Sequence, residues 1–443
     1  MRLIQTIRNI FKIEDLRARL IYTFGIILLY RFGKYITLPG IDPSQLEGLR
    51  HQTSSGIMGL LDMFSGGAFS QASIFALGIM PYISASIVVQ LLGIVFPYFQ
   101  KLQKEGESGR RKMNQFTRIL TVFILVLQAP TYLVNLHAQL PASAFIMTGV
   151  FFQVSSVIIL TAGTMFVMWL GERITDKGIG NGISLIIMIG IVARMPANFV
   201  FEAGARMNGA GGAVALVVEM VVLFVVILGT VLLVQGTRRV PVQYARRIVG
   251  NKQYGGVRQY IPLKVNAAGV MPIIFAQAIM MLPIIIAGYS SNPTSGFVVA
   301  FSNMYGFWYN LVTAILIILF TYFYTAVTIN PVQMAEDMKK NGGFIPGIKP
   351  GRKTVEFFDT IMSRITLPGS IFLAIIAILP AIAVQVGITP QFAQFYGGTS
   401  LLILVGVILD TLQQIESHLL MRHYDGLMKS GRVKGRSGAV TSI

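Results

Sequence analysis

The sequence predicts an all-α polytopic membrane protein that crosses the bilayer ten times. Of its 443 residues, 54% are hydrophobic and only 12% are charged, about half the charged fraction of an average soluble protein. Ten apolar stretches are each long enough to cross, as a helix, a hydrocarbon core about 30 Å thick. These observations exclude a disordered chain and a soluble enzyme.

The ten stretches are separated by charged and turn-forming residues. Because a lipid-exposed backbone satisfies its hydrogen bonds only in a helix or a closed barrel, runs of this length predict helices. The predicted spans are 20–38, 74–96, 117–136, 147–171, 183–203, 213–234, 267–288, 308–329, 366–386 and 397–421.

Lys and Arg residues are distributed unequally between the two sides that these spans define. Of the 36 basic residues, 31 fall on the side that holds both termini and five fall on the other. Basic residues collect in cytoplasmic loops, so this split predicts that both termini are cytoplasmic. The five residues on the external side are Arg31, Lys34, Arg50, Arg194 and Arg206.

Two predicted cytoplasmic loops, 235–264 and 330–365, are long and basic. Topology and attraction to anionic lipid account for a few such charges. The alternative is a docking surface for an acidic or RNA-rich partner. The charge pattern leaves both interpretations open.

Two sequence patterns recur between the first five spans and the last five. Residues 78–85 and 269–276 share G-x-M-P-x-I-x-A, and residues 182–187 and 398–403 share G-x-S-L-x-I. Both pairs are the second and fifth spans of their halves. Because each half has an odd number of spans, the repeat predicts two halves of inverted topology with a functional site between them.

The repeat makes two pairs of isoleucines symmetry-related, namely Ile83 with Ile274 and Ile187 with Ile403. Ile79 lies one helical turn from Ile83 on the same face. If the halves face each other, these side chains form a hydrophobic constriction that excludes water. Packing against other helices or against lipid is the alternative for each of them.

The predicted spans carry few groups suited to catalysis or to ion coupling. Glu219, Asp410 and Glu416 lie in spans six and ten, and we interpret them as interfacial or interhelical bonding groups. The four histidines do not cluster, the cysteine count is zero, and no metal, nucleotide or protease motif is present. We therefore expect no enzymatic activity and no cofactor.

The stretch 57–73 is apolar but too short to span the bilayer, and the sequence SGGA interrupts it. Irregular backbone at membrane depth is tolerated only inside protein or a cavity. A re-entrant helix that enters a central cavity and a helix on the membrane surface are both compatible with the pattern.

Long strings of this sequence resemble the SecY family, the channel-forming subunits of the bacterial Sec protein translocon. The resemblance runs from about residue 15 to about residue 425. The strings are MFSGGAFSQASIFALGIMPYISASIVVQLL at 63–92, EGESGRRK at 105–112, TAGTMFVMWLGE at 161–172, DKGIGNGIS at 176–184, IPLKVNAAGVMP at 261–272, GGFIPGIKPG at 342–351 and YGGTSLLI at 396–403.

The resemblance implies a clamshell of two inverted five-helix halves, 1–212 and 213–443, around a central pore, with a short re-entrant plug helix at about 57–72. It implies a lateral gate between spans two and seven, where Ser84 and Gln90 are candidate residues. It implies a pore ring of Ile79, Ile83, Ile187, Ile274, Ala278 and Ile403, and a plug that contains Asp62, Met63, Phe64, Ser65, Gly66 and Gly67.

The resemblance also implies partners and a location. The partners are SecE and SecG, the SecA motor, the ribosome, signal sequences, precursor proteins and membrane lipid, and no direct DNA binding is expected. The location is the bacterial inner membrane. Docking of the motor or the ribosome is assigned to Arg238, Arg239, Arg246, Arg247, Lys349 and Arg352.

Two residues depart from the family pattern. Lys349 stands where the family commonly has arginine, which keeps the charge but loses bidentate geometry, and Glu219 has no counterpart that the family pattern explains. The alternative function is a secondary transporter of small solutes, which also has inverted repeats but normally carries buried charges or polar pockets.

Overall fold

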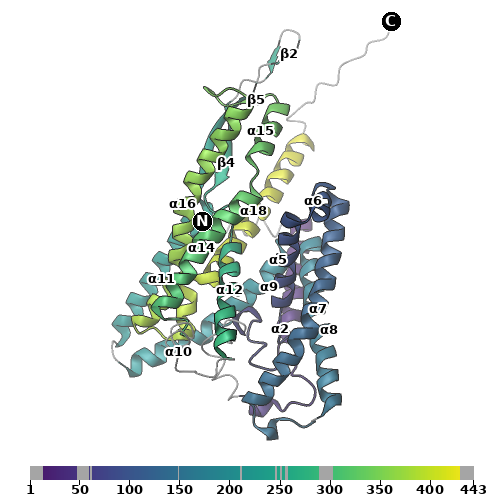
Figure 1. Cartoon of the computed structure of the whole chain (residues 1–443), viewed down its shortest axis with the longest axis vertical. Coiled ribbons are helices and arrows are strands. Elements are labelled where there is room, and N and C mark those ends of the chain that lie inside the picture. The colour runs from purple at the N-terminus through teal and green to yellow at the C-terminus, as the bar shows by residue number, and fades with distance from the viewer. Residues whose placement is uncertain are drawn as a thin grey trace.

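The computed structural model describes residues 13–46, 59, 62–147, 149–209, 212–244, 247–249, 252–254, 258–288 and 303–429. Within these ranges the chain is predominantly helical (Figure 1). The principal helices are α2 (Glu14–Gly33), α5 (Met80–Val95), α6 (Pro97–Lys104), α7 (Glu107–Gln139), α8 (Val150–Lys177), α9 (Gly182–Val192), α10 (Met195–Asn208), α11 (Gly212–Gln235), α12 (Met271–Gly288), α14 (Phe307–Thr328), α15 (Pro331–Lys340), α16 (Arg352–Gln385), α17 (Pro390–Ala393) and α18 (Gly398–Lys429).

These helices account for all ten predicted spans. Among the described residues, seven helical segments are long and apolar enough to cross a membrane, and the bent pair α5 and α6 would make an eighth. The other two predicted spans correspond to α2 and α12, which are not among these segments. α2 carries charged residues near both of its ends, and α12 is described only as far as Gly288.

The second and seventh spans begin in the same way. Gly78 and Gly269 both have left-handed backbone conformations, with φ of 55° and 63°, which glycine adopts without a steric penalty. Two residues later α5 begins at Met80 and α12 begins at Met271, each with proline as its second residue. The prediction that span two starts at residue 74 was therefore wrong, because the glycine turn delays the helix to Met80.

The predicted fifth span is two helices rather than one. α9 ends at Val192, and α10 begins at Met195 with proline in its first turn. Proline cannot donate the hydrogen bond that a continuous helix requires at that position. The interruption places Arg194 between the two helices.

The two basic loops contain strands that the sequence analysis did not predict. β1 (Thr237–Tyr244) pairs antiparallel with β4 (Arg258–Lys264), in the register Val240↔Ile261, and β5 (Gly343–Phe344) from the second loop pairs with the end of β1. A two-stranded hairpin, β2 (Arg247–Val249) and β3 (Lys252–Tyr254), lies between β1 and β4 in sequence. The two loops thus form one folded unit, which we call the platform.

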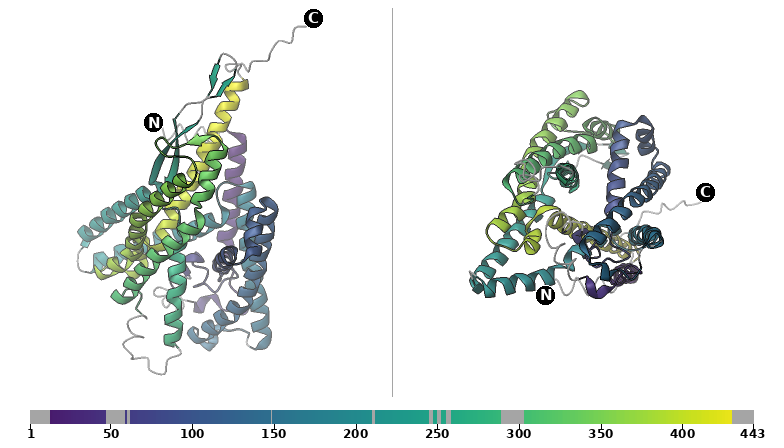
Figure 2. Two further views of the ribbon diagram at one scale, coloured as in Figure 1. Left: turned by 45° about the horizontal axis from the view of Figure 1, so that its top comes forward. Right: turned by 60° about the horizontal axis from the view of Figure 1, so that its bottom comes forward.

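The helices form two groups with shared contacts along one seam. In Figures 1 and 2, α2, α7 and α8 lie on one side and α11, α14 and α16 on the other. The principal buried apolar cluster contains residues of both groups, including Tyr30 and Ile187 from the first and Ile403 and Phe395 from the second. Part of the interior between the halves is therefore a packed core, which contains Ile79, Ile187 and Ile403 of the predicted ring.

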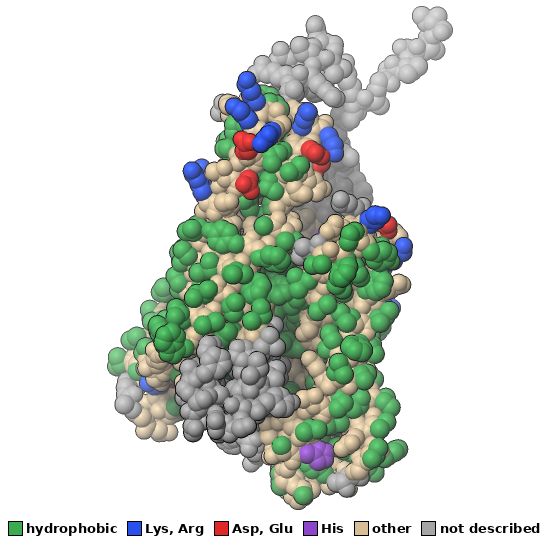
Figure 3. Space-filling model, in the orientation of Figure 1, with side chains coloured by type: hydrophobic (Ala, Val, Ile, Leu, Met, Phe, Trp, Pro, Cys, Tyr) green, Lys and Arg blue, Asp and Glu red, His purple; other side chains and the backbone are tan. Residues whose placement is uncertain are grey.

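The outer surface agrees with a membrane location. Large hydrophobic side chains cover the middle of the face in Figure 3, whereas Lys, Arg, Asp and Glu side chains gather at the end that carries α15 and the platform. Several residues of α11 that face outward are more than half exposed, among them Val217, Phe224 and Val225. This distribution is that of a multi-pass membrane protein.

Candidate functional site

The structure brings together the four isoleucines that the internal repeat pairs. Ile83 on α5, Ile187 on α9, Ile274 on α12 and Ile403 on α18 all line one cavity of about 480 Å³. Each comes from a different helix, two from either half of the chain. Of the other two predicted ring residues, Ile79 is 2% exposed, belongs to the central apolar cluster and does not line the cavity. The side chain of Ala278 lies outside the described residues.

Polar residues line the same cavity as the isoleucines. They are Ser86, Gln90, Asn181, Ser184 and Asp410. Asn181 also caps α9 by accepting a hydrogen bond from the Ser184 amide at 3.3 Å. The cavity wall therefore has both polar and apolar residues, as a wet vestibule beside a hydrophobic constriction requires.

Segment 62–72, the described part of the predicted plug, lies inside the protein. Met63 and Phe64 are 2% and 5% exposed and belong to the central apolar cluster together with Ile79 and Ile187. The Ser400 hydroxyl donates to Met63 Sδ at 3.1 Å, which joins the segment to the start of α18. Its position is that of a re-entrant segment and not of a surface helix.

Backbone groups of this segment are held by polar side chains of the first half. Tyr30 donates to the Ser65 carbonyl at 3.1 Å, Arg31 donates to the Gly66 carbonyl at 3.2 Å and Tyr132 donates to the Phe69 carbonyl at 2.9 Å. Gly66, with φ of 66°, also approaches α9 closely, since a Cβ there would lie 2.9 Å from the Gly190 Cα. Glycine is therefore required at that contact.

Asp62 anchors the same segment by its charge. Its carboxylate is fully buried, and Oδ1 accepts the Ser70 amide at 2.8 Å. Oδ2 lies 2.7 Å from Nη2 of Arg194, a close ionic contact without the alignment of a hydrogen bond. The break between α9 and α10 thus places a cation against the buried carboxylate.

These anchors were not predicted from the sequence, in which Arg31, Lys34 and Arg194 counted only as basic residues on the external side. In the structure Arg31 and Arg194 bond to the segment, and Nζ of Lys34 lies against Gly67, where a Cβ would be 2.8 Å away. One signal was available in the sequence. Lys and Arg are disfavoured on the external side, so the few that lie there are candidates for a local bonding partner.

The two predicted gate residues have different neighbours. Ser84 donates to the Met80 carbonyl in its own helix at 3.1 Å. Gln90 reaches the other half, because its Oε1 lies 3.5 Å from the Tyr324 hydroxyl on α14. This contact is long and joins two neutral groups, so it contributes little to holding the halves together.

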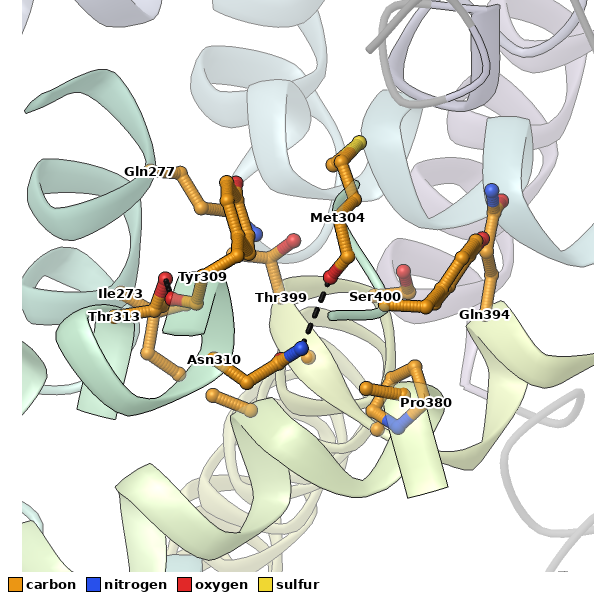
Figure 4. A pocket seen from close by; sticks show the side chains of 15 residues that line it. Ile273, Gln277, Met304, Tyr309, Asn310, Thr313, Pro380, Gln394, Thr399 and Ser400 are labelled. Carbon is orange, nitrogen blue, oxygen red and sulfur yellow. Dashed lines mark hydrogen bonds between the residues drawn. The ribbon is translucent and has the colours of Figure 1, made fainter. Parts of the chain in front are cut away.

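A second, smaller pocket lies within the last five spans (Figure 4). Its volume is about 80 Å³, and Gln277, Tyr309, Thr313 and Thr399 contribute polar groups to its wall. Tyr305 also lines the pocket and lies just before α14, and burial raises the pKa of its phenol above the ordinary value. The pocket has room for a few water molecules.

Basic residues of the platform are exposed. Arg238 and Arg239 on β1, and Lys349 and Arg352 before and at the start of α16, all face solvent. Arg246 and the side chain of Arg247 lie outside the described residues. Beneath the basic surface a small apolar core, which includes Val242 and Phe358 at 0% exposure, packs β1 against α16. The platform therefore exposes basic residues of both loops on one packed unit.

Metal-binding side chains do not cluster in the described ranges, where no three His, Asp or Glu residues stand close enough to hold an ion. His137 stacks on Phe145, with ring centroids 4.1 Å apart. Asp410 and Glu219 bond to neighbouring side chains, Gln414 and Arg206 respectively.

Comparison with known proteins identifies relatives along nearly the whole chain. The SecY family model matches residues 73–412. The protein translocase subunit SecY of Corynebacterium glutamicum is 44% identical over 438 residues, which cover 95% of this chain and 98% of that protein.

Solved structures share the fold at low sequence identity. A SecY structure, described as one whose plug domain stabilises the closed state of the translocation channel, aligns with a TM-score of 0.62 and 18% identity over 90% of this chain and 92% of that one. Sec61 in a canine ribosome-channel complex aligns with a TM-score of 0.59 and 17% identity over 90% and 92%.

Proposed function

The chain belongs to the SecY family and is the protein-conducting channel of a Sec translocon, and we propose that unfolded precursors cross it through the ring of isoleucines between its halves. The observation that supports this most is the shared cavity, whose wall contains Ile83, Ile187, Ile274 and Ile403. A chain that passes between the halves has to pass these four side chains.

The physical problem that such a channel solves is the cost of exposing peptide groups to lipid. Each unsatisfied backbone group costs several kcal/mol in the hydrocarbon region. A hydrated path removes that cost for polar segments. A signal sequence with 7–15 apolar residues instead gains by entering lipid, so the channel also opens sideways.

In the resting channel, the ring and the plug form two successive seals. The isoleucines provide an apolar constriction that water leaves readily. Asp62, Met63 and the neighbouring plug residues block the space on its external side, held by Tyr30, Arg31 and Arg194. Translocation displaces the plug and leaves the ring closed loosely around the passing chain.

The lateral gate lies between α5 and α12, with α14 beside it. Gln90 and Tyr324 provide a weak polar contact across this seam, and Ser84 precedes Gln90 on α5. A contact of this strength lets the binding energy of a signal sequence open the gate.

We assign the partners of the family to particular surfaces of the chain. The platform lies on the cytoplasmic side and docks SecA or the ribosome through Arg238, Arg239, Lys349 and Arg352. SecE and SecG complete the channel within the bacterial inner membrane. Both termini are cytoplasmic, and the two halves are 1–212 and 213–443. The channel performs no chemistry of its own, because the motor or the ribosome supplies the energy.

A reconstitution tests this function. Vesicles that contain the chain with SecE and SecG, supplied with SecA and ATP, are expected to protect an added precursor from protease. Omission of SecA or ATP is expected to abolish protection. A flux of small solutes that needs neither SecA nor precursor, without any protection of precursor, would support the secondary transporter instead.

A further inference from the structure

The cavity that contains the four isoleucines also contains a charged group to which the path described above gives no role. Of the described residues that line its wall, Asp410 on α18 alone is charged. Asp410 follows Ile403 by two helical turns, so the two residues lie on the same face of α18. The carboxylate therefore lies about 10 Å along the helix from the ring and lines the same space.

The hydrogen bonds of Asp410 place it beside the loop that precedes α9. The side-chain amide of Gln414 donates to Oδ2 of Asp410 at 3.3 Å. Oε1 of the same Gln414 accepts the backbone amide of Gly180 at 2.9 Å. Asn181 and Ser184, at the start of α9, line the cavity as well. Gln414 therefore orients the carboxylate and holds it next to a loop of the first half.

Helix α5 repeats this arrangement in the first half. Gln90 follows Ile83 by two helical turns on one face, and both residues line the cavity. α5 and α18 both run from the ring toward the end of the molecule that carries the platform (Figure 1). Polar groups of both halves therefore lie on the platform side of the isoleucines, and a precursor that enters from that side passes them first.

The charge of Asp410 is not neutralised by an ion pair within the described part of the chain. The pairs found there involve the carboxylates of Asp15, Asp62, Glu107, Glu172, Glu202, Glu219, Asp337 and Glu356. Arg19, which reaches the same loop, donates to the Gly178 carbonyl at 3.5 Å and pairs with Asp15. Asp410 is also exposed, so its negative charge acts on whatever occupies the cavity.

A signal sequence brings the complementary charge, because a basic segment precedes its apolar one. Basic residues stay on the cytoplasmic side of a membrane, which is the side of Asp410 and the platform. We propose that Asp410 binds the basic segment of a signal sequence while the apolar segment enters the gate between α5 and α12. It is then a specificity-determining residue that favours precursors with this charge. The inference rests on the proposed function, because it requires a precursor in the cavity.

Changing the charge on both partners tests the proposal. The unmodified channel and Asp410→Asn are reconstituted with SecE and SecG and supplied with SecA and ATP. Two precursors are compared, one with lysines before its apolar segment and one with glutamines at the same positions. The measured quantity is the ratio of their translocation rates at limiting precursor. Glu416→Gln, which changes an exposed carboxylate on the same helix that does not line the cavity, is the matched control.

We expect Asp410→Asn to lower the ratio of lysine to glutamine precursor by about 2- to 5-fold, the effect of one ion pair in contact with water. Glu416→Gln is expected to keep the ratio of the unmodified channel. Equal ratios in the unmodified and Asp410→Asn channels would overturn the proposal. An unmodified channel that translocates neither precursor would instead refute the proposed function, so the two failures are distinguishable.

A second measurement tests the contact itself. Asp410→Cys and Glu416→Cys each give a channel with a single cysteine, because the chain has none of its own. A precursor with a thiol-reactive probe at one of its basic positions is arrested in each channel. We expect a crosslink to Asp410→Cys and none to Glu416→Cys. A crosslink to Glu416→Cys alone, or to neither variant in channels that hold the precursor, would show that the basic segment binds elsewhere.

Discussion

Replacing Asp62 by asparagine removes the charge of the plug anchor and leaves its shape. The asparagine oxygen still accepts the Ser70 amide, so the variant loses only the ionic contact with Arg194 at 2.7 Å. We expect the closed plug to be destabilised and the idle channel to leak ions.

The size of the effect follows from the burial of the pair. Two unit charges about 4 Å apart attract by about 4 kcal/mol at an effective dielectric constant of about 20. Asp62 is fully buried but the Arg194 side chain is 25% exposed, so water recovers part of this energy for the arginine. A net loss of about 1–2 kcal/mol raises the open-plug population roughly 5- to 30-fold.

Single-channel recording in planar bilayers, without precursor, measures this population. Asp15→Asn, which removes an exposed partner of Arg19 on α2, is expected to conduct like the unmodified channel. Arg194→Gln leaves the carboxylate buried without a counter-charge, so we expect it to leak more than the double variant Asp62→Asn/Arg194→Gln. An Asp62→Asn channel that translocates normally and shows no added idle conductance would show that the ionic contact with Arg194 does not hold the plug closed.

Three further predictions concern the ring and the platform. Ile187→Asn places an amide in the constriction and lowers the barrier to its hydration by about 1–3 kcal/mol, so idle conductance is expected to rise in the same recordings; unchanged conductance would remove Ile187 from the ring. Phe358→Ala empties a fully buried site in the platform core, at a cost of about 3–5 kcal/mol, and is expected to weaken SecA binding, measured on reconstituted vesicles, without changing idle conductance; full SecA affinity would contradict the docking role. Lys349→Arg gains bidentate geometry at an exposed position and is expected to tighten SecA binding by up to about 1 kcal/mol; weaker binding would show that lysine is required there.

Hydrophobic length and repeated motifs were sufficient to predict the spans and the meeting of the four isoleucines. An apolar run can be recognised without knowing its neighbours, and the repeat related Ile83 to Ile274 before any contact was known. Helix starts were predicted less well. The left-handed Gly78 and the proline after Met195 moved or broke helices within runs that are apolar throughout.

Contacts between residues far apart in the sequence were not predictable in this way. β1 contains two arginines and a proline, and its strand is stabilised by pairing with β4 and with the short β5 of the other loop. The Arg194 and Asp62 pair depends on the break between α9 and α10 together with the return of the plug into the core. Glu219 likewise has its ionic partner, Arg206, on another helix.

The passage of a precursor through the isoleucine ring is tested most directly by crosslinking. Ile83→Cys and Ile403→Cys each give a channel with a single cysteine, since the chain has none, and Val225→Cys on the exposed face of α11 is the control. Each is reconstituted with SecE, SecG and SecA, and a precursor carrying a thiol-reactive probe is arrested during translocation. We expect ATP-dependent crosslinks at both ring positions and none at Val225→Cys. A channel that translocates but forms no crosslink at either ring position would contradict it.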